Sequence, residues 1–378
     1  MDALSQFPQT HRTLAAWLAL FHCRGIGPTR FNRLLDQFGA PERILGLPAT
    51  TLTAANLPAK VASGLAKPAW ERVHHDLRWL AANEQHHILT LADDRYPPLL
   101  KQITDPPPVL FIHGDPRHLP SPQLAIVGSR NPSPGGLENA KRFAQTLSDA
   151  GLCITSGMAL GIDAAAHQGA LAVCGPTIAV IGCGPDIVYP ARHRQLATAI
   201  AGQGAIVSEF APGTRPLAEN FPRRNRIISG MALGVLVVEA APQSGSLITA
   251  RLAGEQSREV FAIPGSIHNP LVRGCHALIR QGAKLVETIE DILEELPAIA
   301  APLSPALGGG EAVEVKLDDK SLLLISKLGY DPVSVDILVA RTQLTPEEVS
   351  SILLLLELNG TVKTVAGGLY TKADTIDE

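Results

Sequence analysis

The residues Leu124-Ala125-Ile126-Val127-Gly128-Ser129-Arg130 begin the alternating pattern that predicts the fold of this 378-residue chain. Four apolar residues that end at a glycine are typical of a buried strand in a parallel sheet. Further short apolar runs follow at Leu152–Thr155, Thr177–Ile181, Ala205–Ser208, Val235–Glu239 and Val260–Ile263. The segments between them have helical character, at 136–150, 161–173, 191–202, 223–232, 246–257 and 271–281. This alternation predicts an α/β, doubly wound core with helices on both faces of a mostly parallel sheet.

A helical domain is expected before this Rossmann-like core, over residues 1–85. Within it, the turn Cys23–Pro28 resembles a helix–hairpin–helix element, because Gly25 and Gly27 suit a tight turn and Pro28 suits a first helical position. Such a turn can point backbone N–H groups at a DNA phosphate. A hairpin that only packs is the alternative, and the sequence leaves both open.

The core is expected to extend over 86–296, followed by a linker over 297–316 that is rich in Pro, Ala and Gly. Residues 317–378 then predict a winged-helix domain. Helices are expected at 319–328, 333–341 and 345–358, before a hairpin made by Thr361–Val365 and Leu369–Thr371.

Composition limits the class of protein. The chain is 46% hydrophobic and 18% charged, and no apolar run is long enough to span a membrane. No secretory signal is visible, and the five cysteines are scattered, so a cytoplasmic protein with free thiols is expected. The net charge of -4 is uneven, because residues 121–290 carry a net +3 and residues 291–378 a net -9. The basic groups therefore cluster in the core.

Small residues follow four of the predicted strands and are expected to line one crevice at the carboxyl edge of the sheet. Glycines there let a ligand approach the backbone, and the N–H groups at helix starts bind anions. The pattern therefore predicts an anion-binding pocket with an arginine at its rim. The candidate residues from these loops are Gly128, Ser129, Arg130, Gly157, Met158, Ala159, Gly161, Gly245 and Ser246.

A second basic feature is the run Asn220–Gly230, in which three arginines follow an aromatic ring. Guanidinium groups bind phosphate oxygens, and Phe221 can stack on a base or belong to the core. Helical spacing places Arg223 and Arg226 on one face and Arg224 elsewhere. At least one of these arginines is a candidate for a structural pair with a core carboxylate such as Glu239. Phe221, Arg223, Asn225 and Arg226 are the predicted contacts from this run.

The sequence lacks the residues that several kinds of site require. There is no P-loop, and the loop after Val127 lacks the glycine pattern of a dinucleotide site, so no cofactor is expected. The pairs His74-His75 and His86-His87 lack partners at metal-ligand spacing, so no metal site is expected. Asp163 and His167 could do acid–base work, but a capping aspartate and a partly buried histidine are favoured. No catalytic residue is predicted.

These motifs resemble those of the DprA/Smf family of DNA-processing proteins. The resemblance rests on 125–130, 156–167, 179–184 with Tyr189-Pro190, 221–230, 244–250 and 261–265, in order along the core. It implies a protein that is not an enzyme, that binds single-stranded DNA in a basic, glycine-lined pocket, forms a homodimer, and helps to load RecA during natural transformation and recombination. It implies no membrane partner.

The sequence departs from the family around Tyr189-Pro190, where Ala191 replaces a frequent Lys and His193 an expected Asn. Arg192 is a candidate DNA contact there, and Arg194 is a further cation. A solvated basic face is the alternative interpretation of this segment.

Two rival functions share the same crevice: a nucleotide-handling enzyme of the phosphoribohydrolase-like Rossmann group, and a nucleotide sensor. The enzyme hypothesis is disfavoured because Thr249 occupies the position at which that group of enzymes has a glutamate. The carboxylate that would stabilise the reacting centre is therefore missing. The winged helix is expected to contact protein or regulate the core. Its expected recognition helix, 345–358, carries Glu347, Glu348 and Glu357 and no Lys or Arg.

Overall fold

The structure is a computed structural model that describes residues 3–296, 318–329, 331–358, 361–365 and 368–372. It divides into two compact units, Met1–Pro305 and Ala306–Glu378. The N-terminal helices and the sheet therefore belong to one unit. The predicted linker 297–316 lies outside the described residues, and the finer domain limits remain predictions.

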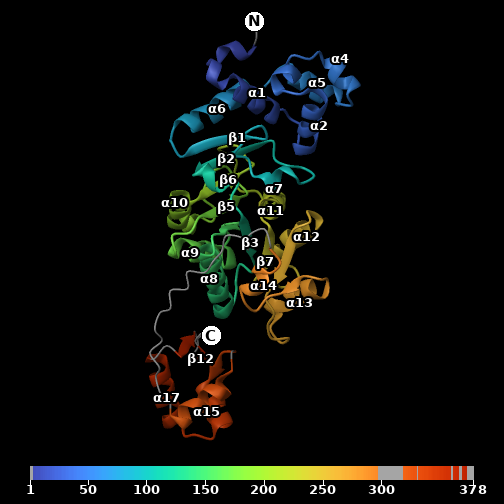
Figure 1. Ribbon diagram of the computed structural model, residues 1–378. Coiled ribbons are helices and arrows are strands. Elements are labelled where there is room, and N and C mark those ends of the chain that lie inside the picture. The colour runs from blue at the N-terminus through green and yellow to red at the C-terminus, as the bar shows by residue number, and fades with distance from the viewer. Residues whose placement is uncertain (1–2, 297–317, 330, 359–360, 366–367, 373–378) are drawn as a thin grey trace. The chain divides into compact units, whose positions relative to one another are not determined.

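A nine-stranded sheet forms the centre of the first unit, in the order β1-β2-β6-β5-β4-β3-β7-β8-β9 (Figure 1). The strands from β6 to β9 in this order are parallel, whereas β1 and β2 are antiparallel additions at one edge. The chain builds outward from β3 to β6, then returns to the other side of β3 for β7. The bounds are β1 His86–Thr90, β2 Val109–Gly114, β3 Gln123–Val127, β4 Cys153–Ser156, β5 Thr177–Ile181, β6 Ala205–Ser208, β7 Gly234–Val237, β8 Glu259–Ala262 and β9 Lys284–Leu285.

Alternate residues of β3 face opposite layers of helices, as a period of two requires. Leu124 and Ile126 pack with the layer of α8 (Pro134–Asp149), α9 (Ile162–Ala172), α10 (Arg194–Gln203) and α14 (Glu290–Leu293). Ala125 and Val127 pack with the layer of α7 (Pro98–Lys101), α11 (Asn220–Met231), α12 (Ser246–Glu255) and α13 (Arg273–Arg280). The predicted doubly wound α/β core is confirmed.

The N-terminal helices form their own apolar core, which continues onto the antiparallel edge of the sheet through Ile88, Val109 and Phe111. Figure 1 shows these helices, in blue, beside β1 and β2. They are α1 Arg12–Phe21, α2 Pro28–Phe38, α3 Pro41–Leu45, α4 Ala49–Ala54, α5 Ala59–Leu65 and α6 Trp70–Ala81. Short 3₁₀ turns occur at Ala3–Gln6, Gln9–His11, Pro116–His118, Ala191–His193 and Pro270–Val272. The predicted tight turn is present: Gly25 has φ +87° and Pro28 opens α2.

The second unit is a winged helix, as predicted. Its helices are α15 Asp319–Leu328, α16 Val335–Thr342 and α17 Pro346–Leu358, and its sheet has the order β10-β12-β11, with β10 Val333–Ser334, β11 Val362–Val365 and β12 Leu369–Lys372. Leu324, Leu338, Leu353 and Leu356 form its centre. Asp318 caps α15 by accepting a hydrogen bond from the N–H of Ser321 at 3.0 Å.

The sequence did not predict β1, β2, β9 or β10, and the two residues of β10 fall at the start of the helix expected over 333–341. His86 and His87 are polar and follow a helical stretch, so their sequence gives no signal for a strand. In the structure they begin β1, and the ring of His86 stacks on Trp79 with 4.1 Å between centroids. Residues 86–90 form a strand because they pair with β2. This pairing is not encoded in the residues of β1 themselves, so it cannot be predicted from them alone.

Candidate nucleic-acid interface

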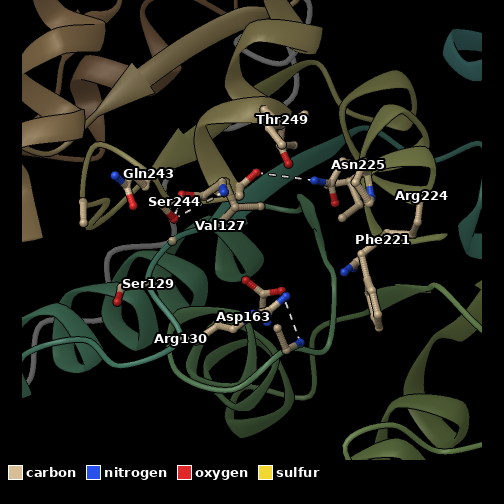
Figure 2. A pocket seen from close by; sticks show the side chains of 18 of the residues that line it. Val127, Ser129, Arg130, Asp163, Phe221, Arg224, Asn225, Gln243, Ser244 and Thr249 are labelled. Atoms are coloured by element: carbon tan, nitrogen blue, oxygen red, sulfur yellow. Dashed lines mark hydrogen bonds between the residues drawn. The ribbon is translucent and has the colours of Figure 1, made fainter. Parts of the chain in front are cut away.

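A cavity of about 810 Å³ lies where the order of the parallel strands reverses, at the carboxyl ends of β3 and β7. This is the position at which open α/β sheets bind ligands. Figure 2 shows side chains from the loops after β3 and β7 and from the starts of α9 and α11 around it. Of the predicted contacts it is lined by Gly128, Ser129, Arg130, Ala159, Phe221, Asn225, Gly245 and Ser246.

The loop after β3 is held close against the neighbouring elements. A Cβ on Gly128 would lie 2.7 Å from Ile162 and 2.9 Å from the carbonyl oxygen of Glu239, so this position requires glycine. The carbonyl of Ser129 accepts a hydrogen bond from the N–H of Ile162 at 3.1 Å. These contacts fix the turn and leave the side chain of Arg130 exposed at the rim.

The opposite wall is the start of α12. The hydroxyl groups of Ser244 and Ser246 form a hydrogen bond of 2.8 Å. The side-chain amide of Asn225 donates a hydrogen bond to the carbonyl of Gly245 at 3.4 Å. A Cβ on Gly245 would meet nothing within 4 Å, so the backbone here borders open space. The positive end of the α12 dipole therefore faces the cavity, which favours an anion.

An aromatic wall closes a third side. Phe221 is half-buried against Gly182, and its ring centroid lies 5.7 Å from that of Tyr189. Tyr189 is 50% exposed. Tyr189 was not among the predicted contacts. No local signal in the sequence places its ring next to Phe221, because the two residues come from different segments.

The floor of the cavity contains two buried side chains of opposite charge, Asp163 and Arg224. The Asp163 carboxylate accepts a hydrogen bond from the N–H of Ala159 at 3.2 Å, and the Arg224 guanidinium donates to the carbonyl of Val180 at 2.8 Å. Burial raises the pKa of Asp163, and the positive charge of Arg224 opposes that rise. A Cβ on Gly157 would overlap the guanidinium, so Gly157 makes room for Arg224 and does not line the cavity.

Arg226 does not reach the cavity. It is 7% exposed, its Nη2 lies 2.6 Å from Glu209 and its Nε lies 3.2 Å from Asp105. The structural pair expected for one of the arginines is present, but its partner is Glu209 and not Glu239. The Glu239 carboxylate accepts hydrogen bonds from the N–H and hydroxyl of Ser133 at 2.9 and 2.6 Å.

Arg223 lies 3.2 Å from the same carboxylate of Glu209, but its side chain is 52% exposed. Arg223 and Arg226 share one face of α11 and Arg224 points elsewhere, as the helical spacing predicted. Arg223 does not line the first cavity. It borders a second cavity toward the N-terminal helices.

The remaining predicted contacts lie behind or beside the pocket. Met158 is buried with φ +55°, and Gly161, with φ +77°, packs against the backbone of Ser129 and Arg130. Arg192 is exposed on a 3₁₀ turn outside the cavity lining. His193 donates from Nδ1 to the carbonyl of Met158 at 3.0 Å, so it supports the wall.

Asp163 and His167 do not form an acid–base pair. His167 is fully buried, where partial burial was expected, and its Nδ1 lies 2.7 Å from the hydroxyl of Thr177. The Thr177 hydroxyl donates to the carbonyl of Ile154, so His167 must donate from Nδ1 and carry an unprotonated Nε2. Burial lowers the pKa of His167 to about 3, which leaves the ring neutral.

No helix in the described part of the chain is long and apolar enough to cross a membrane. Within the same residues, no group of three or more His, Cys, Asp or Glu side chains is placed to hold a metal ion.

Comparison with known proteins gives consistent matches. Residues 87–297 match the protein family described as DNA recombination-mediator protein A, and residues 311–368 match the DprA winged helix domain. Protein Smf of Escherichia coli K12 is 46% identical over 301 residues, which span 78% of this chain and 80% of that protein. Protein DprA of Streptococcus pneumoniae is 48% identical over 206 residues, which span 54% of this chain and 73% of that protein.

Solved structures agree. The X-ray structure of DNA processing protein A from Streptococcus pneumoniae matches with a TM-score of 0.67 and 36% identity, over 74% of this chain and 97% of that one. DNA processing protein A from Helicobacter pylori, described for its single-stranded DNA binding mode, matches with a TM-score of 0.52 and 30% identity, over 57% and 96%. With the family match across the sheet and winged helix, these similarities show that the chain belongs to the DprA/Smf family of DNA-processing proteins.

Proposed function

We propose that this protein binds single-stranded DNA in the cavity at the carboxyl ends of β3 and β7, without catalysing a reaction. The observation that carries the proposal is the convergence of Arg130, the start of α12 and the ring of Phe221 on one cavity at the strand-order reversal. The single-stranded DNA binding described for the Helicobacter pylori relative supports the same ligand.

Phosphate capture accounts for the affinity in this proposal. The guanidinium of Arg130 and the positive end of α12 attract the sugar–phosphate backbone. Each phosphate that a cation neutralises releases counterions, so the affinity falls with salt by about 0.7 in log–log slope for each contact. Backbone contacts carry little sequence information, so weak base preference is expected.

Base stacking accounts for the preference for a single strand. Phe221 and Tyr189 present tilted rings to the cavity, and the face of a base can lie on either. Bases paired inside a duplex are not available for this contact. Double-stranded DNA is therefore expected to compete poorly.

We infer the absence of catalysis from the residues that line the cavity. Among the described residues that line the cavity, Asp163 is the only carboxylate, and it is 7% exposed beneath the charge of Arg224. Thr249 also lines the cavity, at the position where the nucleotide-handling enzymes carry a glutamate. Among the described lining residues, no carboxylate or histidine is therefore exposed to exchange a proton with a substrate in the open part of the pocket.

The cellular role follows as a further part of the proposal. The bound strand is passed to RecA, and two copies of the chain in a homodimer hold one strand together, which raises avidity for long DNA. The name of the matching family, a recombination mediator, supports the link to strand exchange.

The test is fluorescence anisotropy of a labelled oligothymidine at two salt concentrations. Arg130→Ala should weaken binding and flatten the salt dependence. Arg117→Ala is the matched control, because Arg117 is 83% exposed and follows β2, whose last residue lies beside the first residue of β6. Arg117 therefore lies at the amino ends of the parallel strands, away from the cavity at their carboxyl ends. Equal loss in both variants, or binding by the wild type that is independent of salt, would sink the proposal.

A further inference from the structure

A second cavity, of about 330 Å³, lies between the turn Cys23–Pro28 and the segments that flank the sheet. One side is made by this turn and by Arg72 of α6, and the other by the chain after β6 and the start of α11. Both sides belong to the same compact unit. Asn32 donates to the carbonyl of Pro106 at 3.1 Å, and the rings of Phe21 and Phe111 lie 5.8 Å apart. The cavity is thus held by fixed packing.

The charge of this second cavity is positive. Arg24, Arg72 and Arg223 line it, and all three are exposed. Glu209 is the one carboxylate among its described lining residues, and it is 4% exposed and already held by Arg226 at 2.6 Å. The net charge around the opening therefore favours an anion.

Its walls also suit a phosphate. The guanidinium of Arg223 lies over the ring of Phe210, 5.3 Å from the centroid. A Cβ on Gly27 would meet nothing within 4 Å, so the backbone of the turn faces open space and a phosphate can approach it closely. This openness is not required for a hairpin that only packs.

The two cavities adjoin. Pro222 lines the first and Arg223, the next residue, lines the second. The same division occurs in the preceding loop, where Pro216 lines the first cavity and Thr214 the second. Exposed Arg215 stands between them. Segments 214–216 and 222–223 therefore border both cavities, and this shared border, here called the ridge, carries the positive charges of Arg215 and Arg223.

We infer that a single strand bound in the first cavity continues over this ridge into the second, where Arg24 and Arg72 contact its next phosphates beside the open turn. The inference rests on the proposed function, because it extends the path of the same strand. It assigns the N-terminal helical hairpin a direct part in binding, and it predicts that strand length decides whether that part is used.

The experiment compares the wild-type chain with Arg24→Ala/Arg72→Ala on two labelled oligothymidines, of about 6 and about 20 nucleotides. The matched control is Arg33→Ala/Arg78→Ala, because these arginines are exposed on α2 and α6 but do not line the cavity. Circular dichroism verifies that all variants are folded.

We expect the Arg24→Ala/Arg72→Ala variant to bind the long strand about tenfold more weakly, with a salt slope smaller by about 1 to 1.5, and the short strand as the wild type does. The control should match the wild type on both strands. Wild-type affinity of the variant for the long strand would overturn this inference and leave the proposed function standing. If the wild type binds neither strand, the proposed function and its extension fail together.

Discussion

The Nη2 atom of Arg226 lies 2.6 Å from Oε2 of Glu209, and both side chains are almost fully buried. Because Glu209 directly follows β6 and Arg226 lies on α11, the pair ties this helix to the end of that strand. Three arginines that look alike in the sequence thus have different surroundings. Arg226 is paired and enclosed, Arg224 lies under the pocket, and Arg223 remains half-exposed.

Arg226→Ala should lower the free energy of unfolding by about 3–5 kcal/mol, because it removes the closer partner of a buried carboxylate. Arg223→Ala should lower it by at most about 1 kcal/mol, since that pair is partly screened by solvent. Urea denaturation of the two variants measures the difference. Equal costs would show that Glu209 does not depend on Arg226.

Gly157→Ala should destabilise the fold by about 1–3 kcal/mol, because the added methyl overlaps the buried guanidinium of Arg224. Gly245→Ala is the matched substitution at an open position and should leave the melting temperature unchanged. Thermal unfolding separates the two. A stable Gly157→Ala protein would mean that Arg224 can leave its place under the pocket.

His167 should make the protein less stable in mild acid. Its pKa is about 3 in the fold and 6.5 in the ordinary range, so as the pH falls between these values the unfolded chain binds a proton there and the folded chain does not. The free energy of unfolding contributed by this group therefore declines as the pH falls through that window. The raised pKa values of Asp163 and Glu209 act with the opposite sign.

The comparison that isolates His167 is His167→Asn, whose amide can still donate to Thr177. The variant should be less stable at neutral pH, but its stability should fall less than that of the wild type between pH 6.5 and about 3. Chemical denaturation across this range provides the two curves. Parallel curves would contradict a neutral, buried His167.

Deleting residues 311–378 should leave most single-strand binding intact. The helix α17 carries Glu347, Glu348 and Glu357, and a DNA-reading helix needs the opposite charge. Anisotropy of the shortened chain with the same oligothymidine tests this. Loss of nearly all affinity would place DNA contacts in the winged helix.

The strands and helices of the core could be predicted because their signals are local. Short runs such as Ile178–Ile181 are apolar throughout, and a strand covered on both faces needs that composition. β1 was missed because its identity depends on pairing with β2, about twenty residues later. The residues of an element determine the spacing of its apolar positions, but they do not show which other strand it pairs with.

The pocket could be predicted in outline for a related reason. The carboxyl ends of parallel strands lie at one edge of the sheet, so the glycines after β3 and before α12 were expected to lie close together. Both line the same cavity in the structure. The roles of the arginines could not be resolved, because Glu209 and Asp105 come from other segments. Met158 and Gly161 were predicted as contacts from their loop, but their backbone turns them into support for its wall.

Photo-crosslinking of an oligothymidine to the full chain, followed by mass spectrometry of the linked peptides, locates the bound strand directly. We expect links at the aromatic wall, to peptides that contain Tyr189 or Phe221, and their loss when excess unlabelled single strand is added. Links confined to the winged helix or to the sheet edge around Arg117, with none at this wall, would contradict it.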